Sequence, residues 1–168
     1  MSLSKENKID QVGALAIATR MQRLADAFRK DGEQIYRLFD IDFQPKWFPV
    51  IVSLKDGTPM TITALADEIG YAHPSTIALL KELEKNKIIV SKKDKTDERK
   101  RLISLSKYGL ALVGKMQPIW TLMTEATEAI IDTENNLLKA IEEVELKLQR
   151  QSFFQKALQL KSATENQS

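Results

Sequence analysis

Apolar residues recur at three- and four-residue steps along most of this chain, with polar residues between them. Such spacing is typical of helices that bury one face. It predicts six helices, over residues 8–39, 45–55, 61–71, 74–87, 106–130 and 135–161. The fourth of these begins with a proline in its first turn, where the missing N–H is tolerated.

The pattern changes between the fourth and fifth helices. Ile88–Val90 is a short β-branched run, residues 91–100 are polar and charged, and residues 101–105 alternate between polar and apolar. This order predicts two strands joined by a charged loop. The expected fold is therefore mainly α with a small β-hairpin wing, which is the order of a winged helix-turn-helix.

Composition excludes several classes of protein. The 168 residues contain no cysteine and one histidine, so disulfides, thiol chemistry and His-rich metal sites are excluded. We expect no catalytic site, no metal and no cofactor. No apolar run reaches the roughly 20 residues of a membrane span, and the start lacks the apolar stretch of a signal peptide. We therefore expect a cytoplasmic protein without a membrane partner.

The net charge is only +2, but the positive charge is concentrated. Residues 81–101 hold nine lysine or arginine residues and five acidic ones. This segment includes the predicted wing, for which we list the candidate DNA-binding residues Lys92, Lys93, Lys95, Asp97, Arg99, Lys100 and Arg101. A narrow minor groove attracts such cations. The alternative is an ordinary polar hairpin tip.

The start of the fourth helix carries almost no charge until Lys81. In a helix-turn-helix, the N-terminal residues of the second helix meet base edges in the major groove. The candidates here are His73, Pro74, Ser75 and Thr76. The alternative is that they only cap the helix and form its first turn. The lysines that follow alternate with Glu82 and Glu84, which favours a solvated helix face.

The outer segments, 8–39 and 106–161, carry long apolar stripes around a lobe at 41–105. They either fold onto that lobe or, as we expect, pack against a second copy of the chain. Residues 162–168 are expected to form a flexible tail.

Several motifs match one known family when taken together. They are Leu65–Gly70, Ser75–Glu84, Asp97-x-Arg99 and Ile103-x-Leu105-Ser106-x-x-Gly109. With these motifs the chain resembles the MarR (multiple antibiotic resistance regulator) family. The resemblance implies a homodimer joined by its terminal helices, with recognition helices in successive major grooves. It implies that Arg99 is the wing-tip arginine in the minor groove and that Asp97 steadies the wing base through Arg99 or Arg101.

The chain departs from the family pattern on its recognition helix. Ala72 stands where a small hydroxyl cap is usual, and Ala78 stands where an arginine is common. These changes weaken the expectation that the helix reads guanine.

The resemblance also implies an effector site. Trp47, Phe48 and Trp120, with Arg20 or Arg23, are candidates to bind a small aromatic or anionic effector, although an aromatic stripe is more often core. The expected function is a sequence-specific transcription regulator that reads a pseudo-palindromic operator in double-stranded DNA. The alternative is a winged-helix dimer that binds another protein and not DNA.

Overall fold

The computed structural model describes residues 7–94, 97 and 100–165. The chain divides into two compact units, Met1–Trp120 and Thr121–Ser168. The boundary falls inside the long helix α6 (Lys107–Ile131). Among the residues that are described, no helix combines the length and the apolarity needed to cross a bilayer.

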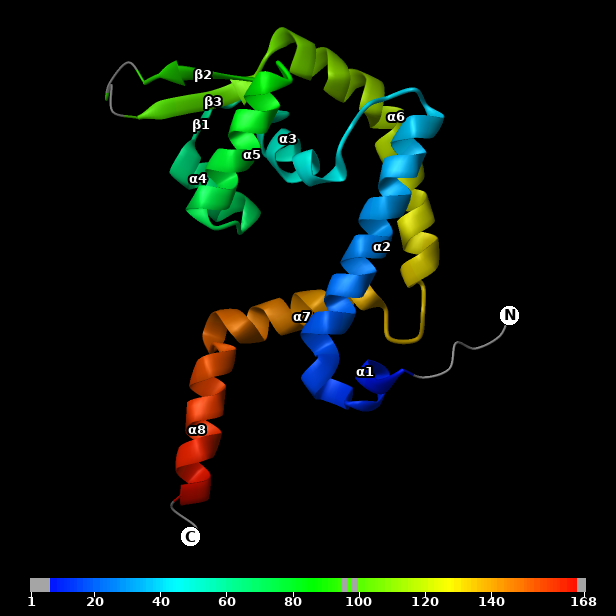
Figure 1. The fold of residues 1–168 in the computed structure, drawn as a ribbon, viewed down its shortest axis with the longest axis vertical. Helices are drawn as coiled ribbons and strands as arrows, with labels where there is room; N and C mark the ends of the chain where they lie inside the picture. The colour runs from blue at the N-terminus through cyan, green and yellow to red at the C-terminus, as the bar shows by residue number, and fades with distance from the viewer. Residues whose placement is uncertain (1–6, 95–96, 98–99, 166–168) are drawn as a thin grey trace. The chain divides into compact units, whose positions relative to one another are not determined.

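The predicted helix 8–39 is divided into three parts (Figure 1). They are α1 (Lys8–Gln11), a 3₁₀ turn η1 (Gly13–Ala16) and α2 (Ile17–Leu38). The break lies at Gly13, whose φ of 63° is easily reached only by glycine. The Asn7 side chain caps α1 by accepting from the backbone N–H groups of Ile9 and Asp10. A single helix over 8–39 was therefore wrong.

The helices of the lobe follow the predicted order. A 3₁₀ turn η2 (Pro45–Trp47) leads into α3 (Phe48–Leu54), and α4 (Ile62–Ile69) and α5 (His73–Lys85) follow. Thr61 caps α4, because its Oγ1 accepts from the Ala64 N–H at 3.1 Å. Gly70, with φ of 68°, ends α4 and begins the turn to α5.

The strands form a small antiparallel sheet in the order β1-β3-β2. The predicted hairpin is confirmed as β2 (Ile89–Lys93) and β3 (Arg101–Leu105), with Ile89 opposite Leu105. A third strand, β1 (Met60–Thr61), pairs with the other side of β3. Strand β1 was not predicted, because two residues are too few to show an alternating pattern.

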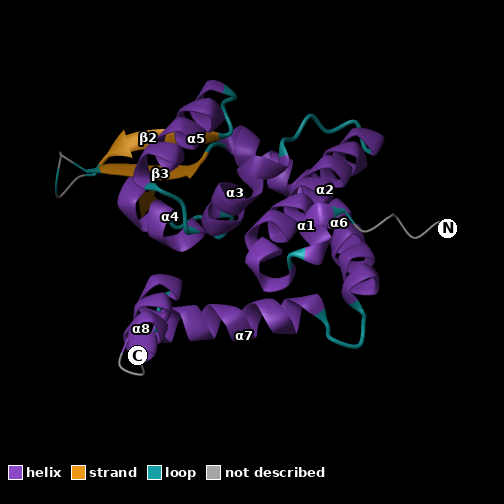
Figure 2. Cartoon of the chain, turned by 60° about the horizontal axis from the view of Figure 1, so that its bottom comes forward, coloured by secondary structure: helices purple, strands orange, loops and turns teal. Residues whose placement is uncertain are grey.

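The core of the lobe lies between the sheet and helices α3, α4 and α5, which Figure 2 shows together. Its members are fully or nearly fully buried: Val50, Ile51, Leu54, Leu65, Leu83, Ile89 and Ile103. Met116 and Ile119, near the middle of α6, are also fully or nearly fully buried.

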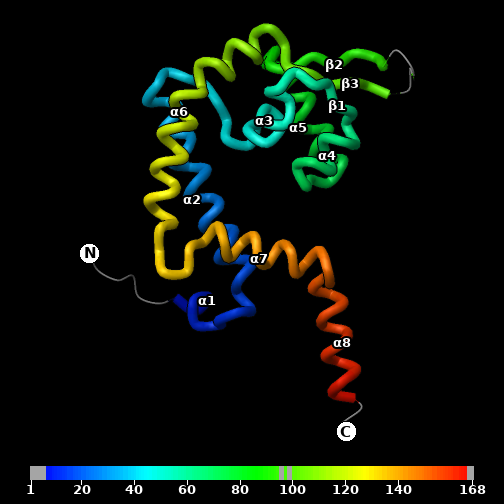
Figure 3. Tube along the Cα trace, turned by 180° about the vertical axis from the view of Figure 1, so that it is seen from behind, coloured from blue at the N-terminus to red at the C-terminus, as the bar shows by residue number. Residues whose placement is uncertain are grey.

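The second unit contains the end of α6, α7 (Leu137–Arg150) and α8 (Phe153–Glu165), which Figure 3 shows as separate helices. The single helix predicted over 135–161 was wrong. Ser152 Oγ accepts from the Gln155 N–H at 3.2 Å, and Gln155 Oε1 accepts from the Ser152 N–H at 2.8 Å. This reciprocal capping box begins a new helix at Phe153. Helix α8 then continues to Glu165, past the expected end at Lys161.

Candidate nucleic-acid interface

The turn between α4 and α5 brings the first residues of α5 to the surface. The Tyr71 N–H donates to the Ala66 carbonyl at 3.1 Å and so holds the turn against the end of α4. Helix α5 begins at His73, with Pro74 in its first turn. The side chains of His73, Pro74 and Ser75 are exposed, as contact with another molecule requires.

Thr76 does not belong to this surface. Its side chain has no exposed area, and its Oγ1 donates to the Ala72 carbonyl at 3.3 Å. It lies in the same buried stripe as Leu79, Leu80 and Leu83. The expectation that Thr76 contacts DNA is therefore wrong: its hydroxyl serves the packing of α5 and not recognition.

The side of α5 opposite that stripe is exposed. Pro74, Ala78, Lys81 and Lys85 follow one another at steps of four, three and four residues, and all four are exposed. We call these four residues the outward face of α5. From the sequence, its lysines were expected to belong to an ordinary solvated helix face. The spacing of the leucines would have located this face, because the side of the helix opposite the buried stripe is the side that stays exposed.

The wing places cations on a protruding hairpin (Figure 1). Lys92 and Lys93 on β2, and Lys100 and Arg101 at the start of β3, are exposed. Two other predicted wing residues, Lys95 and Arg99, lie outside the described residues.

Hydrogen bonds across the hairpin hold the base of the wing. Arg101 donates from Nε to Ser91 Oγ at 2.6 Å and from its guanidinium to the Ser91 carbonyl at 3.0 Å. Asp97 lies 3.9 Å from the Lys100 ammonium and accepts the Lys100 N–H on its carbonyl at 2.8 Å. Among the described residues, Asp97 therefore contacts Lys100, and Arg101 is hydrogen-bonded to Ser91 across the hairpin.

The Ser106-x-x-Gly109 motif joins the wing to α6. Ser106 Oγ accepts from the Gly109 N–H at 2.9 Å and donates to the Lys87 carbonyl at 2.6 Å. A side chain on Gly109 would overlap the backbone oxygen of Ile88. Glycine at this position therefore allows the first turn of α6 to lie directly against the backbone that enters β2.

Glu82, on α5, is held by residues of η2. Its carboxylate accepts from the indole N–H of Trp47 at 2.8 Å and forms an ion pair with Lys46 at 2.8 Å. The hydrogen bond from Lys46 is the largest cause that lowers the pKa of Glu82 below its usual range. The carboxylate of α5 nearest to the outward face is thus neutralised by partners within the lobe.

The proposed effector residues do not form one site. Trp47 is buried and packs edge-on against Phe43 at 5.7 Å. Phe48 and Trp120 do meet, with ring centroids 5.5 Å apart, and the Trp120 indole donates to the Tyr36 hydroxyl at 2.8 Å.

Arg20 lies elsewhere. It is on α2 sixteen residues before Tyr36, about 24 Å along the helix. There it lies 3.8 Å from Asp10, which also pairs with Arg23. Arg20 and Arg23 therefore cannot join Trp120 in a pocket within one copy of the chain.

Comparison with known proteins gives a match only at the level of structure. No family model matches the sequence, and no curated protein matches it. The repressor CouR, solved on a 23-mer DNA duplex, is 19% identical, with 84% of this chain and 99% of CouR covered and a TM-score of 0.68. Staphylococcus aureus MepR in a DNA complex is 21% identical, with 80% and 97% covered and a TM-score of 0.64.

A third solved structure is BpsR of Bordetella bronchiseptica, whose DNA binding is regulated by 6-hydroxynicotinic acid. It is 20% identical, with 82% of this chain and 93% of BpsR covered and a TM-score of 0.61. The chain has the winged-helix fold of the MarR-family regulators. In this MarR-type fold α4 and α5 are the helix-turn-helix and β2–β3 is the wing, as the sequence predicted.

Proposed function

We propose that this chain is a MarR-family transcription regulator that binds double-stranded DNA sequence-specifically as a homodimer. The observation that carries the proposal lies within one lobe. An exposed α5 face without an acidic residue accompanies a hairpin whose described residues expose four cations. The helix suits a major groove and the basic hairpin suits the flanking minor groove.

We propose that the dimer is formed by the terminal helices, 8–39 and 106–161. Large apolar side chains are exposed on α1, η1, α2, α6, α7 and α8, and Leu15 and Phe153 are 85% and 81% exposed. Helices α7 and α8 have no buried residue in this single chain. Apolar surface of this extent marks an interface. A two-fold dimer would present two recognition helices about 34 Å apart to a pseudo-palindromic site.

The half-exposed edge formed by Phe48 and Trp120 is the proposed effector position. It offers two aromatic rings at the junction of α3 and α6. A small aromatic molecule fits such a surface by stacking. We place the protein in the cytoplasm, where its DNA would be, and propose no catalytic activity.

The test is a selection of genomic fragments by the purified full chain at near-physiological salt. The variant is Lys92→Ala/Lys93→Ala on the wing, and the control is Lys161→Ala on α8. We expect the wild type and the control to recover one palindromic motif. The wing variant should bind that motif more weakly, with a salt slope reduced by about 3.6 when both wings of the dimer are engaged, because the variant removes two lysines from each protomer and each phosphate contact contributes about 0.9.

Two results would contradict the proposal. If a well-folded dimer recovers no motif, the protein-interaction alternative becomes the better explanation, with the α5 face as its docking surface. If the wing variant recovers the motif with unchanged affinity and salt slope, the hairpin does not bind DNA.

A further inference from the structure

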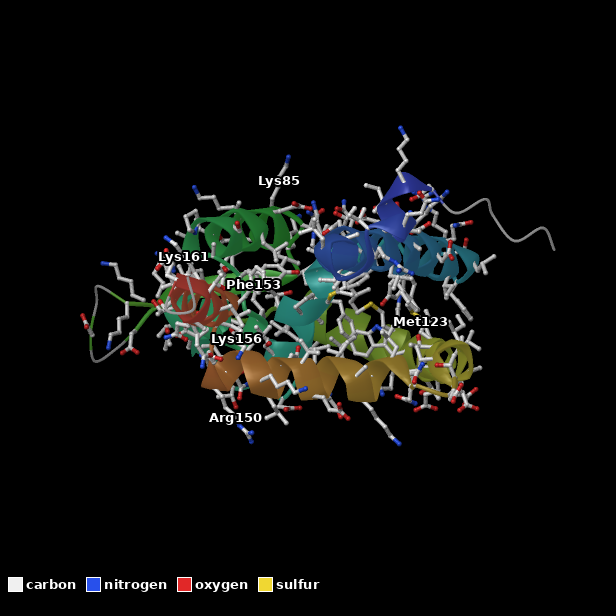
Figure 4. The ribbon with its side chains drawn as sticks, turned by 90° about the horizontal axis from the view of Figure 1, so that it is seen from below. Lys85, Met123, Arg150, Phe153, Lys156 and Lys161 are labelled. Atoms are coloured by element: carbon white, nitrogen blue, oxygen red, sulfur yellow. The ribbon has the colours of Figure 1, made fainter. Side chains whose placement is uncertain are left out.

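The outward face of α5 differs in chemistry between its two halves. Its first half is apolar, with Pro74 and Ala78 exposed and Ile77 half-buried beside them. Its second half carries Lys81 and Lys85. Figure 4 shows the Lys85 side chain pointing away from the helix into solvent.

The first two turns of helix α5 lack the side chains that most often read purines. Guanine is usually read by a bidentate arginine or lysine, and adenine by asparagine or glutamine. The segment His73–Lys85 contains no arginine, asparagine or glutamine, and its lysines lie in its last two turns. Because the N-terminal residues of a recognition helix meet the base edges, the lysines are better placed for phosphates.

The two carboxylates of α5, Glu82 and Glu84, lie in its last two turns, away from the N-terminal residues that meet base edges, and do not take over the readout either. A glutamate can accept from the amino group of cytosine. Glu82 is the acid nearest to the outward face, and it is engaged by Trp47 and Lys46 inside the lobe. Beside the exposed side chains of His73 and Ser75, the groups left at the first half of the face are the methyl of Ala78, the edge of Ile77 and the Pro74 ring.

We infer that Ala78, together with Ile77, reads the 5-methyl group of thymine, so that each half-site of the operator contains an A·T pair at the base that faces Ala78. This inference rests on the proposed DNA-binding function and makes its specificity concrete. Thymine is the base that presents a methyl group in the major groove, and alanine is one of the side chains that contact it. Lys81 and Lys85 then hold the flanking phosphates.

The experiment replaces single thymines of the selected operator by deoxyuridine, which removes only the methyl group. One methyl corresponds to about a fourfold loss of affinity, since burying such a group contributes about 0.8 kcal/mol. We expect this loss for the full-length wild type at one or two thymines of each half-site and none at the others.

The matched protein variants are Ala78→Gly, which removes the methyl, and Ala78→Ser, which keeps the helix propensity closer to wild type. The ratio of affinities for thymine and deoxyuridine is measured within each protein, so any change in the folded fraction cancels. In Ala78→Gly the ratio at the critical thymine should fall from about four toward one. In Ala78→Ser it should also fall.

Two outcomes separate this inference from the proposed function. If the wild type selects an operator but binds its thymine and deoxyuridine forms equally, methyl readout is wrong while DNA binding stands. If the ratio of affinities for thymine and deoxyuridine at the critical position is the same in Ala78→Gly and Ala78→Ser as in the wild type, Ala78 does not read that methyl group. If no operator is selected at all, the proposed function fails and this inference fails with it.

Discussion

Alanine in place of Gly109 should destabilise the lobe, whereas alanine in place of Gly114 in the same helix should stabilise it. A Cβ on Gly109 would overlap the Ile88 carbonyl oxygen and would lie 3.2 Å from the Ile88 carbonyl carbon. That oxygen accepts the Ser106 N–H at 2.9 Å, so it cannot move away without weakening a hydrogen bond. At Gly114 an added Cβ meets nothing within 4 Å in this chain.

The two changes share the same gain in helix propensity, about 1 kcal/mol for glycine to alanine. At Gly109 this gain opposes an overpacking cost of about 1–3 kcal/mol and a weakened hydrogen bond of about 1 kcal/mol. The net expectation is a loss of about 1–3 kcal/mol at Gly109 and a gain of about 0.5–1 kcal/mol at Gly114.

Thermal unfolding at one fixed protein concentration measures both variants, because association makes Tm depend on concentration. For a chain of this length, 1 kcal/mol corresponds to about 2–4 °C. Tm should therefore fall by about 2–12 °C for Gly109→Ala and rise by about 1–4 °C for Gly114→Ala. Equal, upward shifts in both would refute the close approach of α6 to Ile88, because only helix propensity would then be acting.

Three further changes test other parts of the structure. Thr76→Val should leave operator affinity unchanged, because the Thr76 hydroxyl is buried; a large loss measured by fluorescence anisotropy would return Thr76 to the DNA surface. Glu82→Gln should be less stable than wild type at pH 7, and the difference should shrink as the pH falls below the usual pKa range of a glutamate. The pKa of Glu82 is lower in the folded state than in the unfolded state, so its ionised form stabilises the fold at pH values above the unfolded-state pKa. This stabilisation is lost as the pH falls through the folded-state pKa. A difference in Tm that does not depend on pH would contradict the ion pair with Lys46. Ser152→Ala should speed hydrogen exchange of the Gln155 amide about fivefold, since an N-cap contributes about 1 kcal/mol; unchanged exchange would mean that the cap does not hold the start of α8.

Hydrophobic spacing predicted which segments are helical, but it did not locate the interruptions. Apolar residues continue at helical steps through Gly13, so the periodic signal there is the same for one helix as for two. Between Leu148 and Phe153 the apolar residues are interrupted by only four polar residues, a gap too short to mark the end of a helix. The local chemistry was present in both places. Gly13 adopts a positive φ, and Ser152 stands three residues before Gln155 in the order of a capping box.

The start of α5 shows how far a sequence can define a surface. The predicted helix is present, and His73, Pro74 and Ser75 are exposed, as the proposed contact with DNA requires. Thr76 was assigned to it by its closeness in sequence. In a helix each residue turns by about 100°, so Thr76 follows the direction of Leu79 and Leu80 and not that of Ser75. The leucine spacing alone was sufficient to separate them.

The effector residues could not be grouped from sequence, because their contacts join segments far apart in the chain. Tyr36 on α2 packs against Phe43 at 4.6 Å and accepts from Trp120 on α6. Phe43 in turn packs against Trp47, whose indole holds Glu82 on α5.

These contacts fix the position of α5 relative to α2 and to the first part of α6. We propose that these two helices take part in the dimer interface. The spacing between two outward faces would then depend on them. A molecule bound at the Phe48–Trp120 edge would contact Trp120 directly and could change DNA affinity only by favouring one arrangement of this series over another. Effector binding and base reading would thus depend on the same small set of side chains.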